Sequence, residues 1–353
     1  MSEIKRSVSL YSYQDEYYNQ QLDLEGCLAE TAKTGATGVE LLAEQMIRRF
    51  PDPIEEEGFR EKWFASLSKY GLEPACYDAF LENRIYDNRT LKISEQIKMM
   101  KRDIRLASLL GFKNLRTLVS TPMEVIEGSL EYAEEMDVKI GLEVHAPFSL
   151  NSDWAEGYME MIRRTGTKYF GFIPDMGIFC KNIPDVVRDK ARRMGAKEEC
   201  IKIVDDCYRQ RVEKGFVKMR YSLDLGKANM EYRMANGLQE MMDAVEKAGG
   251  GEADRMYAGS SFTFSWSDPQ DIVDNIEYIY HTHAKFYNMS EDYKETAVAL
   301  PEVVSAFDRA GYKGFLSSEY EGGEHLRYDM EVNSIEQVRR HQEALRRAIE
   351  KEA

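Results

Sequence analysis

The feature of this sequence that most restricts its fold is an eightfold alternation between short apolar runs and segments with helical periodicity. The apolar runs are rich in β-branched and aromatic residues, as β-strands are, and a glycine ends most of the helical segments that follow them. Strands that alternate with helices are typical of βα units and of a parallel sheet. The eight expected strands cover residues 7–13, 37–42, 74–77, 114–119, 139–145, 169–175, 278–286 and 314–320.

Eight such units predict an α/β fold of the (β/α)8 TIM-barrel class rather than an open, doubly wound sheet. No GxGxxG motif follows the first expected strand, which argues against the dinucleotide-binding form of the open sheet. The chain has 353 residues, and single barrels run from about 200 to more than 400 residues with insertions. We therefore expect residues 1–353 to form a single TIM-barrel domain.

One connection is too long for this pattern. About a hundred residues separate the sixth expected strand from the seventh, where a βαβ crossover needs only a few tens. Residues 181–270 are therefore expected to form a large, mainly helical insertion. The segment from Met219 to Met256 holds six methionines, and methionine-rich surfaces are adaptable contacts. The insertion is thus expected to be either a lid on its own barrel or a region that docks another subunit.

Charge and cysteine content narrow the range of functions. The 62 acidic residues against 47 basic ones give a net charge of −15, which repels a phosphate backbone and disfavours nucleic-acid binding, DNA-repair endonucleases included. No apolar run is long enough for a membrane span, and the first residues lack the features of a signal peptide. Five cysteines without a CxxC pair suit a reducing compartment. We expect a cytoplasmic protein.

Polar side chains stand near the carboxyl ends of the last four expected strands. Glu143 lies in the fifth strand, Asp175 ends the sixth, His281 and His283 share a face of the seventh, and Glu319 lies in the eighth. Active sites of TIM barrels are built from these ends of several strands. Each residue alone is more often a helix cap, a surface charge or a core group. Their coincidence in consecutive strands instead indicates a site for Mn²⁺, Mg²⁺, Co²⁺ or Zn²⁺.

The motifs GLEVHAP, PDMG, HTHAKF and LSSEY, in this order, resemble the metal-binding strands of the xylose-isomerase-like TIM barrels, the sugar phosphate isomerase/epimerase superfamily. In the ketose 3-epimerases of that superfamily, a sugar-binding histidine follows the aspartate of strand six by three residues. This chain has Ile178 there, which puts simple ketose epimerisation in doubt. The resemblance implies four metal ligands: Glu143, Asp175, His283 and Glu319. His281 is the alternative to His283 as the imidazole ligand.

Longer segments, VSLYSYQDEYY, GATGVELLAEQMI, PACYDAFLENRIYDNRTL and GLEVHAPFSL, resemble the α (catalytic) subunit of bacterial C-glycoside deglycosidases and their near relatives. This resemblance implies a hetero-oligomer with a smaller β subunit and Mn²⁺ as the metal. It also implies cleavage of the carbon–carbon bond between an aromatic aglycone, such as a flavonoid, and a 3-oxo-glucosyl group. The alternative is a metal-dependent sugar or sugar-phosphate isomerase or epimerase that acts through an enediolate. A non-catalytic scaffold barrel is disfavoured by the complete set of ligand types.

The deglycosidase hypothesis assigns roles to further residues. Removal of the C2 proton would give an enolate that expels the aryl group by β-elimination, and this departure needs an acid/base group. His145 is our candidate, because it shares a strand face with Glu143 and imidazole exchanges protons near neutral pH. A metal-ligating carboxylate, Glu143 or Glu319, is the alternative proton carrier. The expected substrate-binding residues are Tyr11, Tyr13, Tyr77, Asp78, Arg116 and His281.

Three further placements follow from the sequence. Tyr77 is as compatible with core packing as with a pocket. Lys285, on the face of His283, either stabilises charge in the site or extends outward. His341 lies between Arg340 and Gln342 on the flank of the last helical stripe, which predicts a surface position.

Overall fold

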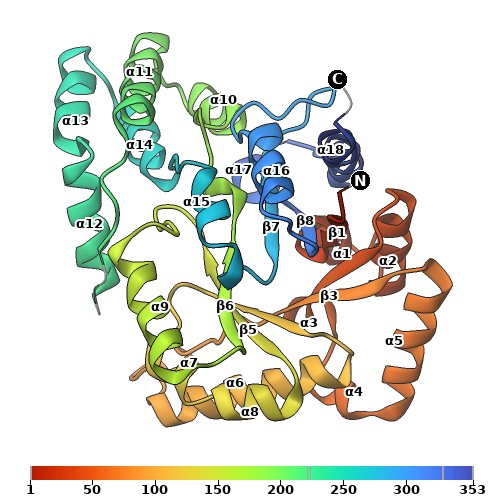
Figure 1. Ribbon diagram of the computed structural model, residues 1–353. Coiled ribbons are helices and arrows are strands. Elements are labelled where there is room, and N and C mark those ends of the chain that lie inside the picture. Colours follow the sequence, from red (N-terminus) through yellow and green to blue (C-terminus); the bar gives the residue numbers. More distant parts are fainter. Residues whose placement is uncertain (1, 221, 223, 328–329, 352–353) are drawn as a thin grey trace.

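Eight parallel strands form a nearly closed barrel in the computed structural model, which describes residues 2–220, 222, 224–327 and 330–351 (Figure 1). The strands pair in the order β6-β5-β4-β3-β2-β1-β8-β7. Isolated parallel bridges from Phe172 to Ile279 and from Asp175 to His283 connect the two outer strands. The TIM-barrel prediction is therefore confirmed. The strands are β1 (Lys5–Ser9), β2 (Gly38–Leu42), β3 (Glu73–Asp78), β4 (Asn114–Thr117), β5 (Lys139–Val144), β6 (Phe170–Pro174), β7 (Thr282–Phe286) and β8 (Phe315–Tyr320).

Helices surround the barrel and connect its strands (Figure 1). Their ends follow from local chemistry: Asp23 accepts a hydrogen bond from the amide of Gly26 at 2.8 Å at the start of α2, and Gly71, with a φ of 65°, ends α5. The longer helices are α2 (Leu24–Lys33), α5 (Glu57–Tyr70), α6 (Ile93–Leu109), α8 (Leu130–Met136), α9 (Asp153–Thr165), α16 (Leu300–Arg309) and α18 (Ser334–Glu350). The short α-helices and 3-10 helices are η1 (Leu10–Tyr13), α1 (Gln14–Tyr18), α3 (Ala43–Met46), α4 (Asp52–Glu55), α7 (Met123–Glu127), η2 (Met176–Ile178) and α17 (Glu324–Arg327).

The long connection between β6 and β7 is mainly helical. Its helices are α10 (Asp185–Arg193), α11 (Glu198–Lys214), α12 (Leu225–Ala235), α13 (Leu238–Lys247), α14 (Glu252–Ser260), η3 (Ser261–Thr263), α15 (Gln270–Asp274) and η4 (Ile276–Tyr278). Helices α11, α13 and α14 pack on one another at one corner of the molecule (Figure 1, upper left). The hydroxyl of Tyr208 donates a hydrogen bond to the carbonyl of Cys180 at 2.8 Å. Phe179 and Trp266 form an isolated antiparallel β-bridge. These contacts hold the helices to the segment that follows β6.

Two strands depart from their expected bounds by four residues at one end. The first ends at Ser9, because Ser12 accepts a hydrogen bond from the amide of Tyr320 at 2.9 Å and donates to the carbonyl of Ser318 at 3.1 Å. These bonds turn the chain into η1 above the barrel. The seventh strand begins at Thr282, since the preceding residues form η4 and the amide of Tyr280 donates to the carbonyl of Phe172.

The prediction of a surface position for His341 is wrong. The ring is fully buried between α18 and the barrel, where it stacks on Phe286 with centroids 3.9 Å apart and an interplanar angle of 10°. Its Nδ1 lies 2.7 Å from the Oγ of Ser318 on β8. The polar neighbours Arg340 and Gln342 suggested an exposed position, but this face of α18 packs against β8.

In the part of the chain that the structure describes, no helix has both the length and the apolar composition that a bilayer crossing requires.

Candidate metal centre

The four side chains expected as metal ligands converge at the carboxyl end of the barrel. One ligand atom of each lies within 4.8 Å of those of the others, and all four side chains are buried. The Nδ1 atom of His283 is 3.0 Å from Glu143 Oε1 and 3.4 Å from Glu319 Oε1. Asp175 completes the group. Three carboxylates and one imidazole form a donor set that fits a divalent cation such as Mn²⁺, Co²⁺, Zn²⁺ or Mg²⁺.

Strand pairing brings these side chains to the same end of the barrel. Asp175 follows β6 directly and forms an isolated bridge with His283 of β7. Lys285, two residues further along β7, lies opposite Glu319 of β8. The carboxylate of Asp175 also accepts a hydrogen bond from the amide of Gly177 at 2.6 Å, which fixes its direction at the start of η2.

Two buried cations accompany the carboxylates. Lys285 Nζ forms an ion pair with Asp175 and lies 3.3 Å from Glu319 Oε2 and 3.0 Å from Glu321 Oε1. Burial opposes the charge of this lysine, but the neighbouring carboxylates outweigh burial and raise its pKa well above the usual value. Of the two placements compatible with the sequence, the structure shows Lys285 inside the site.

Arg116, at the end of β4, forms the second buried cation. Its Nε lies 3.1 Å from Asp78 Oδ1 and 3.9 Å from Glu143 Oε2. The guanidinium is 3% exposed and sits over the ring of Phe80, 5.2 Å from its centroid. Arg116 thus connects a carboxylate of β3 to an expected metal ligand of β5.

The four expected ligands lie at a cavity of about 480 Å³, and three of them line it. His145 and Lys285 share this polar surface. Apolar side chains form the rest of the wall, and Thr263 and Phe264 reach it from the connection between β6 and β7. The lining includes Tyr11, Phe80, Arg116, Leu118, Glu143, His145, Asp175, Phe264, Lys285, Glu319 and Leu326.

His145 follows β5 and is partly exposed to the cavity. Its Nδ1 lies 2.8 Å from the carbonyl oxygen of Ala146, which can only accept a hydrogen bond. A neutral ring therefore carries its proton on Nδ1 and leaves the lone pair on Nε2 to exchange a proton. The ring also packs edge-on against Phe148, with centroids 6.1 Å apart.

Among the expected substrate-binding residues, Tyr11 and Arg116 line the cavity, and four others do not. Tyr13 and Tyr77 are fully buried in the core, and Tyr77 packs against Phe112 with centroids 5.9 Å apart. Asp78 is buried behind Arg116. His281 is also buried, because the residue two positions before His283 on the same strand face lies one layer deeper in the barrel.

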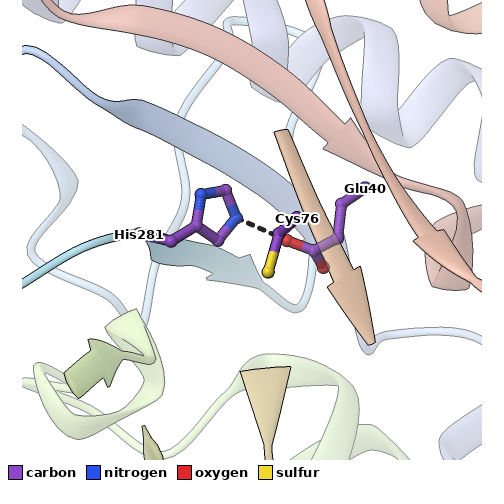
Figure 2. Close-up of side chains that lie close together, drawn as sticks. All are labelled: Glu40, Cys76 and His281. Atoms are coloured by element: carbon purple, nitrogen blue, oxygen red, sulfur yellow. Dashed lines mark hydrogen bonds and ion pairs between the residues drawn. The ribbon is translucent and has the colours of Figure 1, made fainter. Parts of the chain in front are cut away.

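The deeper layer holds a group that the sequence did not reveal. Glu40 of β2 lies beside His281 and Cys76 (Figure 2), and its carboxylate is 2.5 Å from His281 Nε2 and 3.2 Å from His283 Nε2. Every residue of β2 is buried, so strand alternation carries no information there. The available signal was an acidic residue inside an otherwise apolar run, since buried glutamates are rare without a partner.

No family model matches the chain. It is 27% identical, over 99% of its length and 93% of the relative, to a C-glycoside deglycosidase alpha subunit from Arthrobacter globiformis. It is 24% identical, over 89% of its length and 87% of the relative, to a 3'-dehydrocarminate deglycosidase alpha subunit from a Microbacterium species. The resemblance inferred from the sequence is confirmed by these relatives.

Solved structures agree on the fold. A xylose isomerase domain protein from Alicyclobacillus acidocaldarius superposes with a TM-score of 0.54 at 12% identity, over 98% of both chains. An L-ribulose 3-epimerase superposes with a TM-score of 0.55 at 11% identity, over 99% of this chain and 95% of the other. At such identities the likeness shows the barrel architecture alone.

Proposed function

We propose that this chain is the metal-dependent catalytic subunit of a C-glycoside deglycosidase, which releases the aromatic aglycone of a 3-oxo-C-glucoside. The observation that carries this proposal is the convergence of three carboxylates and His283 at a cavity whose wall is partly apolar. The similarity along nearly the whole chain to C-glycoside deglycosidase alpha subunits supports the substrate class.

Glu143, Asp175, His283 and Glu319 would hold the divalent cation, for which Mn²⁺ is our choice, with Mg²⁺, Co²⁺ and Zn²⁺ as alternatives. Such a cation would supply a Lewis acid that polarises the sugar carbonyl. Lys285 and Arg116 keep the carboxylates together by offsetting part of their mutual repulsion.

The reaction is a β-elimination without net oxidation or reduction. A base takes the proton from C2, next to the 3-oxo group, and the electron pair of this C–H bond forms an enolate. The enolate collapses to a C1–C2 double bond, the C1–aryl bond breaks, and its electron pair remains on the aryl carbon, which gains one proton. The products are the free aglycone and a 1,2-unsaturated 3-oxo sugar.

His145 is the proposed acid/base residue. The hydrogen bond from Nδ1 to Ala146 orients the ring and leaves Nε2 to take up and deliver a proton. Glu143 and Glu319 are the alternative carriers, since both also line the cavity. Tyr11 and Arg116 would bind the sugar through their polar groups.

The apolar part of the wall suits an aromatic ring. Phe80, Leu118, Phe264 and Leu326 line the cavity beside the polar groups. Because Phe264 belongs to the connection between β6 and β7, we assign residues 181–270 a lid role over the aglycone. Docking of the partner is the other role of this segment that we consider.

We also propose a smaller β subunit, because the relatives are named alpha subunits. We propose a cytoplasmic enzyme, because five cysteines without a CxxC pair suit a reducing compartment. The alternative activity is isomerisation or epimerisation of a sugar or sugar phosphate, which needs the same ligand set and the same cavity.

The test is incubation of the Mn²⁺-loaded chain, with and without the product of its neighbouring gene, with 3-oxo-C-glucosides and with free ketoses. We expect release of the aglycone, detected by liquid chromatography, and none from the Glu143→Gln variant. Conversion of ketoses without any aglycone release would refute the deglycosidase assignment in favour of the alternative.

A further inference from the structure

Glu40 contacts two histidines with the two oxygens of one carboxylate. Oε2 lies 2.5 Å from His281 Nε2, and Oε1 lies 3.2 Å from His283 Nε2. All three side chains are fully buried in the barrel. Figure 2 shows the carboxylate directed at the ring of His281, with Cys76 beside it.

The two nitrogens of His283 face different groups. Nε2 faces Glu40, while Nδ1 faces Glu143 and Glu319. Glu40 Oε1 faces Nε2 at 3.2 Å without the geometry of a hydrogen bond. Its negative charge favours a proton on Nε2 and leaves the Nδ1 lone pair directed at the other ligands. We propose that Glu40 is a positioning residue, which holds His283 in the orientation and tautomer that bind the metal through Nδ1. This inference rests on the proposed metal centre.

His281 acts on the second oxygen of Glu40. Its Nε2–H donates to Oε2, while its Nδ1 has no hydrogen-bond partner among the described residues. The hydrogen bond to His281 therefore fixes one oxygen of the carboxylate while the other oxygen faces His283. In this role His281 supports the site through Glu40 rather than through contact with a substrate.

A second metal ion at Glu40, Cys76 and His281 fits the structure less well. Ligand atoms of these residues lie close together, but the 2.5 Å between Glu40 Oε2 and His281 Nε2 is a hydrogen-bond distance. Two ligands of one tetrahedral cation are about 3.4 Å apart. Burial and the charge of Glu40 also raise the pKa of Cys76 well above its usual value, which keeps the thiol protonated.

The Glu40→Gln variant tests the proposal. An amide can accept from one histidine and must donate to the other, so one of the two rings has to move its proton to Nδ1. We expect the affinity for Mn²⁺, measured by calorimetry on the folded protein, to fall about 10–100-fold. The matched control is Glu16→Gln, which alters a buried glutamate that accepts from the amide of Ser334 and should leave the affinity unchanged.

A purely structural role of Glu40 would lower the unfolding temperature and leave the affinity of the folded protein intact. That result would overturn the proposal. A wild-type chain that binds neither Mn²⁺ nor Zn²⁺ would instead refute the metal centre itself, and the inference with it. The two failures are thus distinguishable.

A second measurement does not use the Glu40→Gln variant. Nitrogen-15 spectra of the Zn²⁺-loaded wild-type protein contain only five histidines, and His283→Gln identifies the signal of His283. We expect a metal-bound Nδ1 and a protonated Nε2. A ring bound through Nε2, with its proton on Nδ1, would overturn the role of Glu40.

Discussion

His341 makes the stability of this protein depend on pH in a direction that can be calculated. The imidazole is fully buried, stacks on Phe286 and contacts the hydroxyl of Ser318. Among the described residues no carboxylate forms an ion pair with it. Burial therefore lowers the pKa of His341 from 6.5 to about 3.

The sign follows from proton binding. Between pH 6.5 and about pH 3, the unfolded chain protonates His341 and the folded chain does not, so the free energy of unfolding falls as the pH falls. This loss begins near the unfolded pKa and is complete only below the folded one. Between about pH 8 and about pH 5 it amounts to about 2 kcal/mol for this one group.

The assay is urea unfolding of the metal-free wild-type protein and of His341→Gln and His341→Phe at about pH 8 and about pH 5. Burial also raises the pKa of Asp103 and of Glu295 to about 7, which favours folding at acid pH in all three proteins. The difference between wild type and variants isolates His341. Wild type should lose about 2 kcal/mol more than either variant, and equal losses would refute the reasoning.

Three further predictions concern the site. Glu143→Gln and Asp175→Asn should each abolish Mn²⁺ binding and aglycone release together, because a neutral amide does not replace an anionic ligand; metal analysis and product chromatography check this, and an active metal-free variant would contradict it. His145→Ala should retain Mn²⁺ and lower kcat by about 10²–10⁴-fold, and full turnover would remove His145 from the mechanism. Arg116→Met should lower the free energy of unfolding by about 3–5 kcal/mol, because the buried Asp78 loses its partner; urea unfolding that shows no change would contradict this ion pair.

The barrel and the convergence of the expected ligands could be predicted from the sequence because both depend on local patterns. Strand and helix periods alternate along the chain, and the carboxyl ends of parallel strands meet at one end of a barrel. Polar residues at the ends of four consecutive strands must therefore lie close together. Glu143, Asp175, Glu319 and the histidines of β7 were predictable as neighbours for this reason, whereas the choice of His283 over His281 came from the resemblance to the isomerase/epimerase superfamily.

Depth within the barrel was not predictable from alternation. Residues two positions apart on a strand share a face but stand in successive layers of the barrel interior. His283 therefore contacts the ligand carboxylates, while His281 contacts Glu40 one layer below. The sequence did not decide whether Tyr13 and Tyr77 line the cavity for a related reason: aromatic residues at strand ends fill either the core or a pocket, and only tertiary packing decides which.

The charges at the end of the barrel indicate selection for function rather than for stability. Glu40, Asp78, Glu143, Asp175 and Glu319 are all buried, and these carboxylates outnumber the permanent cations Arg116 and Lys285 that pair with members of the group. Buried ion pairs are often no more stable than apolar side chains of the same volume, and unpaired buried carboxylates are costly. A chain under selection for folding alone would fill this layer with aliphatic residues, as TIM barrels commonly do. A cluster of buried carboxyl groups is instead what a divalent cation can hold together, so the proposed metal centre accounts for the composition of these strands.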